Sequence, residues 1–235
     1  VNGINIGHEL GHKTKHKTKT FFAHIMLLTA IQNHFIPYHN GGHHRDVATP
    51  DDLSSAKEGD IFYFFALRSQ IGGYFKTWKL EFQRLKASGK SVLLNPMIIY
   101  TALPLILFLF IFNIYGIEVT FIYFLTAVYG ISVLEAQNYF SHYGLRRKIL
   151  ENGRYERVKP YHSWNSDHLI GRILLFELTR HSDHHHSGSK PYQILDSKEN
   201  SPVLPYGYPM MLILSYFPFI FIPLMKKHLR RHNIN

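Results

Sequence analysis

The chain has 235 residues, a formal net charge of +10, 17 histidines and no cysteine. The absence of cysteine excludes disulfides, thiolate zinc sites, iron–sulfur clusters and a cysteine nucleophile. The basic residues form no single stripe, and long uncharged, aromatic-rich segments separate them, so the charge favours a membrane surface over nucleic acid as the anionic partner. This length suits one large domain, and we expect residues 1–235 to form it.

Two histidines, His8 and His12, stand four residues apart near the start of the chain. On a helix this spacing places both imidazoles on one face. Together with Glu9 they match H-E-x-x-H, the pattern of zinc metalloproteases in which the glutamate is the general base. Because the motif follows Val1 so closely and no signal peptide precedes it, we expect the chain to be a fragment.

The next apolar stretch, residues 21–38, predicts a helix that ends at Pro37. A second group of imidazoles follows it directly, at His39, His43 and His44. Their spacing of i, i+4 and i+5 again suits neighbouring ligands on a helix.

Residues 45–55 are rich in turn formers and predict a loop. Residues 60–86 are amphipathic, with dense aromatic residues followed by scattered basic ones, and predict a helix lying at a membrane surface. The pair Gly72 and Gly73 favours a break in that helix.

Two uncharged runs, residues 91–117 and 119–134, predict a transmembrane hairpin over about 92–140. A soluble buried hairpin is the alternative. The basic residues at 145–148 place both ends of the hairpin in the cytoplasm, because positive charge collects on that side. All the histidine groups then lie on one side of the membrane.

Residues 164–180 predict a helix, capped by Asn165 or Ser166, that carries a third group of imidazoles. This group is His181, His184 and His185. Further on, residues 203–225 are uncharged but contain four prolines, and a basic tail follows. We expect this last segment to be re-entrant or to lie on the surface, because spanning would carry the basic tail outside.

Three histidine groups exceed what one protease zinc needs, so the pattern predicts two metal ions. An all-imidazole set that performs redox chemistry favours iron over zinc. The acids Glu9, Asp46 and Asp183 lie near the groups and are candidates to hold imidazole N–H groups from behind.

The sequence resembles the integral-membrane alkane monooxygenases over essentially its whole length. Residues 8–13, 39–44 and 179–185 resemble their three histidine signatures. Residues 138–145 are similar to the further motif that separates this family from fatty-acid desaturases. Residues 46–50 and 163–166 also match.

The resemblance implies nine ligands that hold two irons, and it adds a histidine that no cluster contains. These residues are His8, His12, His39, His43, His44, His142, His181, His184 and His185. Five other histidines match no ligand position, namely His162, His168, His186, His228 and His232. The sequence departs from the family at Tyr38, Ser141 and Thr179, where glutamate, glutamate and glutamine are usual. The family also has four transmembrane helices ahead of the first signature.

The resemblance further implies an all-α integral membrane protein with a cytoplasmic, histidine-rich di-iron cap, in the bacterial inner membrane. Its expected activity is O₂-dependent hydroxylation of medium or long alkanes at the terminal carbon. Electrons would come from a rubredoxin-like donor and its reductase, since this chain has no cysteine or flavin motif. The alternatives are a fatty-acid desaturase or related lipid hydroxylase, a zinc membrane protease using Glu9, and a non-catalytic metal-binding membrane protein.

Overall fold

The computed structural model describes residues 2–232, and within that range the chain is helical with two isolated β-bridges, Ile149 with Tyr155 and Asn165 with Val203. This confirms the predicted all-α class. The chain divides into two compact units, and each is discontinuous in sequence. Unit 1 comprises Val1–Gly42 and Gly72–Leu134, and unit 2 comprises His43–Ile71 and Glu135–Asn235.

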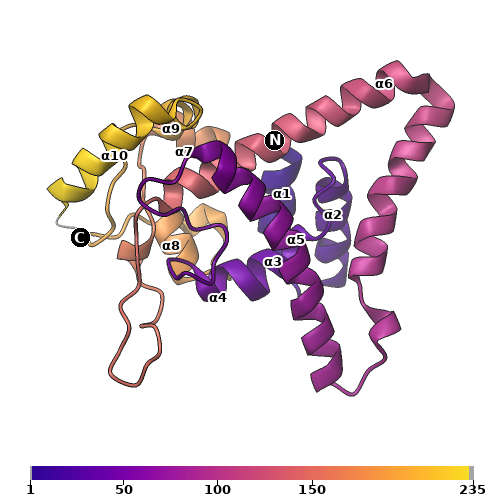
Figure 1. Ribbon diagram of the computed structural model, residues 1–235, viewed down its shortest axis with the longest axis horizontal. Helices are drawn as coiled ribbons and strands as arrows, with labels where there is room; N and C mark the ends of the chain where they lie inside the picture. Colours follow the sequence, from indigo (N-terminus) through magenta and orange to yellow (C-terminus); the bar gives the residue numbers. More distant parts are fainter. Residues whose placement is uncertain (1, 233–235) are drawn as a thin grey trace. The chain divides into compact units, whose positions relative to one another are not determined.

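Unit 1 begins with two helices that pack side by side, α1 (Asn2–Gly11) and α2 (Lys17–Leu28) (Figure 1). They approach closely at Gly7, where a Cβ atom would lie 2.7 Å from Leu27 Cγ. Their shared apolar core is small and continues into α3 (Phe35–Tyr38). Because this core holds α1 against α2, it fixes the direction in which the first histidine pair points.

The single helix predicted over residues 21–38 is wrong. The chain leaves α2 after Leu28, turns, and re-enters a helix only at α3. Ile31 takes a left-handed φ of 54°, and the Asn33 amide donates a hydrogen bond of 3.0 Å to the His24 carbonyl. A side chain that bonds a backbone carbonyl competes with the helix ladder, and here it stabilises the turn.

Helix α5 (Phe62–Ala87) runs from unit 2 into unit 1 without the predicted break at Gly72 and Gly73. In unit 1, a Cβ atom on Gly73 would lie 3.3 Å from the Tyr38 ring. This glycine therefore allows a close approach rather than a bend. A short 3₁₀ turn, η2 (Val92–Leu94), follows the helix.

Helix α6 (Met97–His142) has 46 residues and bends sharply along its length (Figure 1). The bend is at Gly116, whose φ of 78° and ψ of −178° are not helical. Within unit 1 the Phe108 ring lies 5.3 Å from that of Tyr123, so the two limbs approach each other on either side of the bend. Pro96–His142 is the one described segment that is long and apolar enough to cross a membrane, and each limb is close to the roughly 20 residues that a span requires.

Unit 2 contains the remaining helices, packed around an aromatic core that includes Trp164, Tyr139 and Phe221. These elements are short, and their bounds are α4 (His44–Asp46), η3 (Pro160–His162), α7 (Leu169–Leu174), α8 (His181–His186), η4 (Tyr192–Ile194), α9 (Tyr208–Ser215) and α10 (Pro218–Arg231). A π-helix, η1 (His39–His43), leads into α4.

The helix predicted over residues 164–180 is also wrong, because only α7 is helical there and the third histidine group occupies its own helix, α8. Phe176 and Glu177 both take left-handed φ values, 50° and 59°, which end the helical path. The N-cap position of α7 is His168 rather than Asn165 or Ser166. The ion pair between Arg172 and Glu177, at 2.7 Å, closes the turn.

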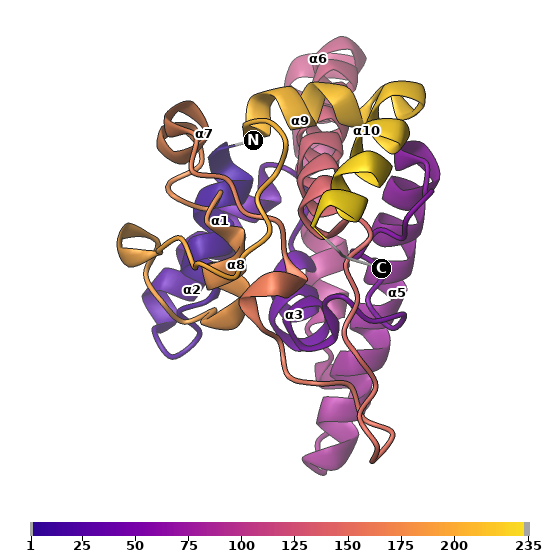
Figure 2. The same cartoon turned by 90° about the vertical axis from the view of Figure 1, so that its left-hand side faces the viewer.

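The uncharged segment 203–225 forms α9 and the first half of α10, which follow each other through a short turn (Figure 2). Neither helix, with 8 and 14 residues, reaches the roughly 20 residues of a span. Met211 and Met225 are buried in the unit 2 core, whereas Phe219 is 74% exposed. One face therefore packs on protein while the other presents apolar side chains.

Candidate metal centre

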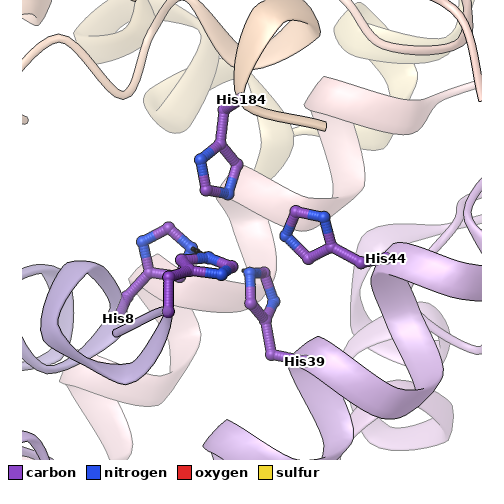
Figure 3. Close-up of side chains that lie close together, drawn as sticks. His8, His39, His44 and His184 are labelled. Carbon is purple, nitrogen blue, oxygen red and sulfur yellow. Dashed lines mark hydrogen bonds between the residues drawn. The ribbon is translucent and has the colours of Figure 1, made fainter. Parts of the chain in front are cut away.

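Three of the nine predicted ligands lie in unit 1. His8 projects from α1 and His39 begins η1 (Figure 3). His12 lies in the turn directly after α1. The His8 Nε2 atom lies 2.8 Å from His39 Nε2 and 3.1 Å from His12 Nε2. His8 and His39 are buried, and the Phe35 ring stacks on His39 at 4.7 Å.

This geometry is unusual for hydrogen bonding alone. An imidazole nitrogen carries either one proton or one in-plane lone pair, so it makes one good hydrogen bond. His8 Nε2 nevertheless has two nitrogen neighbours at such distances. Two nitrogens bound at about 2.1 Å to one ion, at right angles, would lie about 3.0 Å apart. The distances from His8 Nε2 therefore suit neighbouring positions around a metal ion.

Unit 2 holds the other six predicted ligands. His43, His142 and His185 offer ring nitrogens within 4.8 Å of one another, and all three side chains are buried. His142 ends α6, whereas His185 lies on α8. His142 belongs to no sequence cluster and was predicted from the resemblance alone, yet it lies within this group.

His181 extends this set in the same manner as His8 in unit 1. Its Nε2 atom lies 3.1 Å from His142 Nε2 and 3.0 Å from His185 Nε2. One nitrogen again faces two others at distances that suit adjacent positions around a metal ion. The other ring nitrogen of His142 lies 3.4 Å from the Ser163 hydroxyl, which leaves Nε2 directed at the cluster.

His44 and His184 complete the unit 2 set, and their rings meet edge to face with centroids 4.9 Å apart (Figure 3). His44 also stacks on His185 at 4.4 Å. Burial, followed by the neighbouring imidazoles, holds the pKa of His185 well below its usual value. Its ring is therefore neutral near pH 7, and neutral imidazole is the form that binds metal.

Asp52, which belongs to no sequence motif, contacts the Nδ1 side of the His43 ring. Its Oδ2 atom lies 2.8 Å from His43 Nδ1 and accepts a 2.6 Å hydrogen bond from Ser55. Burial alone would raise the pKa of Asp52, but His43 and the Ser55 hydroxyl hold it well below its usual value. With Nδ1 bonded to Asp52, the Nε2 atom of His43 is the one that faces His142 and His185.

The acids proposed from sequence have other neighbours. Asp46 accepts two hydrogen bonds from Arg45, at 2.7 and 2.8 Å, and Glu9 pairs with Lys13 at 3.4 Å. Asp183 binds Lys190 and the backbone N–H of Asp196. The prediction that Asp183 supports an imidazole is wrong, because lysine and backbone donors use its oxygens.

Two histidines outside the predicted ligand set, His162 and His228, have local hydrogen-bond partners. His162 is fully buried, with Nε2 3.2 Å from Glu156 Oε1 and Nδ1 accepting from the Lys159 backbone at 3.0 Å. His228 donates to the Val203 carbonyl at 2.7 Å. These contacts are structural in kind, and they agree with the assignment of both residues as non-ligands.

Grouped imidazoles, most of them buried and with no carboxylate among the grouped donors, define a histidine-rich candidate metal centre in a membrane protein. The family model for fatty acid desaturases matches residues 1–215. The chain belongs to this family, which confirms the superfamily predicted from the histidine motifs. It is a membrane protein, as its long apolar helix and its family together establish.

Several curated proteins are similar over nearly the whole chain. Alkane 1-monooxygenase 1 of Alcanivorax borkumensis is 42% identical over 233 residues, which is 96% of this chain and 56% of that protein. The alkane 1-monooxygenases of Ectopseudomonas oleovorans and Pseudomonas putida are each 40% identical over 226 residues, which is 93% of this chain and 55% of those proteins. The chain thus spans a little more than half the length of these relatives.

Proposed function

We propose that this chain forms the metal-binding part of an alkane monooxygenase, which hydroxylates medium- or long-chain alkanes at the terminal carbon. One oxygen atom of O₂ enters the C–H bond, and the other leaves as water with two electrons and two protons. The similarity to alkane 1-monooxygenases supports the substrate class. The observation that carries the metal requirement is the pair of nitrogens, His8 Nε2 and His181 Nε2, that each face two further imidazoles.

We propose that the nine predicted histidines hold two iron ions. Iron would supply the O₂ activation that cleavage of a strong C–H bond requires, which zinc cannot do because it has no accessible redox change. The side chains of this chain bind and orient the metals, and no nucleophile is needed. Seven of the nine imidazoles are buried, which limits the access of water to the metal ligands.

The electron donor in this proposal is a rubredoxin-like protein with its reductase. Support comes from composition, because the chain has no cysteine for an iron–sulfur centre of its own. We further propose that the protein lies in the bacterial inner membrane with the metal ligands on the cytoplasmic side. The basic residues at 145–148, directly after α6, support this orientation through the positive-inside rule.

The test uses the full-length enzyme, purified from membranes and assayed with a rubredoxin, its reductase and n-alkanes. About two irons per chain, well above zinc, and 1-alkanol as product are expected. His142→Ala should lower iron content and reduce turnover by more than the roughly 10–100-fold that loss of a supporting partner costs. His162→Gln is the matched control, because it changes a buried histidine outside the predicted ligand set.

The same assay separates the alternatives. Dehydrogenated lipid products would identify a desaturase, and one tightly held zinc without iron would favour a protease with Glu9 as general base. Full iron occupancy and normal turnover in His142→Ala would remove that residue from the ligand set.

A further inference from the structure

The segment that follows His44 folds back on the histidine before it. Ala48 takes a left-handed φ of 59°, and the chain then returns so that Asp52 reaches His43, nine residues earlier. The side chain of Asp52 has no exposed surface in this position. A carboxylate is costly to bury unless hydrogen bonds satisfy its oxygens, so donors must surround Asp52 in this position.

The Asp52 carboxylate is held by three donors. Ser55 donates to Oδ2 at 2.6 Å, the Ser54 backbone N–H donates to Oδ1 at 3.1 Å, and His43 Nδ1 lies 2.8 Å from Oδ2. Ser55 in turn accepts from the Ala48 backbone at 2.9 Å. These bonds fix the carboxylate plane before any metal binds, so the imidazole is oriented by a rigid partner.

The loop is also tied to α5. The Ser54 hydroxyl lies 2.8 Å from that of Ser69 on that helix, and both residues are buried. The next residue of the helix, Gln70, donates a hydrogen bond to Glu135 on α6. A polar path within unit 2 thus anchors the carboxylate behind His43 to two long helices.

We propose that Asp52 is a positioning residue for the metal centre, which fixes the tautomer and ring orientation of His43 and raises the affinity of its Nε2 atom for the cation. This inference rests on the proposed metal-binding function. A hydrogen bond from a carboxylate to the distal nitrogen of a ligating imidazole increases ligand basicity. It also places negative charge close to the metal, which stabilises the higher oxidation state.

The test compares Asp52→Asn and Asp52→Ala in the full-length protein. Asp52→Asn keeps an oxygen that can accept from Nδ1 but removes the charge, so it should weaken metal affinity about 10-fold and raise the reduction potential of the bound iron. Asp52→Ala removes the acceptor as well and should weaken affinity by about 100-fold. Affinity is measured on metal-free protein with Co²⁺ and with Fe²⁺ against a competing chelator.

Glu156→Gln is the matched control, because Glu156 is a buried carboxylate bonded to His162, which is not a predicted ligand. It should lower thermal stability but leave Co²⁺ affinity and the potential unchanged. Asp51→Asn, at the exposed neighbour of Asp52, should change neither. Ser55→Ala, which weakens the support of the carboxylate, should fall between wild type and Asp52→Asn.

The possible results separate a failure of the proposed role of Asp52 from a failure of the proposed metal-binding function. If wild type binds Co²⁺ and Fe²⁺ but Asp52→Asn matches it in affinity and potential, Asp52 only stabilises its own loop and the inference is wrong. A loss of thermal stability alone in Asp52→Asn would overturn the inference in the same way. If the wild-type protein binds neither metal, the proposed metal centre itself fails.

Discussion

Two buried carboxylates in unit 2 hold histidine rings in similar ways. Asp52 faces His43 within the imidazole cluster, whereas Glu156 faces His162 in the loop before α7. Glu156 accepts hydrogen bonds from the Lys148 backbone N–H at 3.0 Å and from the Tyr161 hydroxyl at 2.9 Å. Burial would raise the pKa of Glu156, but these donors and Lys159 lower it to about 2.

This low pKa predicts how stability should vary with pH. A carboxylate whose folded pKa is depressed from 4.5 to about 2 stabilises the fold fully above pH 4.5, and loses that contribution as the pH falls towards 2. Glu156→Gln should therefore cost about 1.5–3 kcal/mol at pH 7, the range for hydrogen bonds to a charged group. Thermal unfolding in detergent should show the gap to wild type narrowing below pH 4.5. A gap that stays constant as the pH falls to about 2 would contradict this assignment.

The grouping of the histidines was largely predictable because imidazoles three or four residues apart on a helix must be neighbours. The supporting acid was not, because nothing in the spacing of Asp52 marks a chain that turns back on His43. Of the three acids considered from the sequence, Asp183 lies within the third histidine group but accepts a hydrogen bond from Lys190. Proximity in sequence therefore predicted which histidines lie together better than it predicted which acid contacts them.

At the scale of elements, the bend in α6 is the feature that most depends on one residue. Gly116 has a φ of 78° and a ψ of −178°, a region that is essentially restricted to glycine. No atom lies within 4 Å of where a Cβ would be, so conformation rather than space requires glycine here.

Gly116→Ala should therefore destabilise the protein by about 1–3 kcal/mol, the usual cost of forcing a residue into such a conformation. Asn113→Ala, one turn earlier on the same exposed limb, is the control and should change stability little. Thermal unfolding of both variants in the same detergent measures the difference. Equal stabilities would show that the bend can relax into another conformation.

Long uncharged runs predicted α6 reliably, because water-soluble domains rarely keep so many consecutive residues without charge. Shorter elements were harder to place. Of the helix predicted over 164–180, only α7 forms. Phe176 and Glu177 take left-handed conformations that end the helical path, and nothing in these residue types predicts this, because both also occur in helices. In α5 the glycine pair predicted a break that is absent, because Gly73 provides space for the Tyr38 ring and does not bend the helix.

At the scale of the whole molecule, the orientation in the membrane stays a prediction that labelling can test. The two limbs of α6 should form a hairpin whose tip faces away from the cytoplasm. The 235 residues contain no cysteine, so single cysteines can be introduced cleanly. Tyr115→Cys avoids the strained position beside it, and its side chain is 62% exposed.

In a full-length protein without other cysteines, Tyr115→Cys should react with a membrane-impermeant maleimide in spheroplasts but not in inverted vesicles. Lys148→Cys, in the exposed basic segment after α6, is the matched control and should show the opposite pattern. Labelling of both residues from the cytoplasmic side would mean that α6 does not cross the membrane as a hairpin.

The π-helix η1 matters for any design that copies this histidine site into another protein scaffold. A regular α-helix turns about 100° per residue, whereas a π-helix, with its i→i+5 hydrogen bonds, turns less per residue, so the side chains after its first residue take other directions. His39, at its start, meets His8, while His43, at its end, meets Asp52 and His142. One short helix thus serves two groups of ligands. A designed scaffold with ideal helices would change the direction of His43 relative to His39, so the irregular turn must be copied together with the histidines.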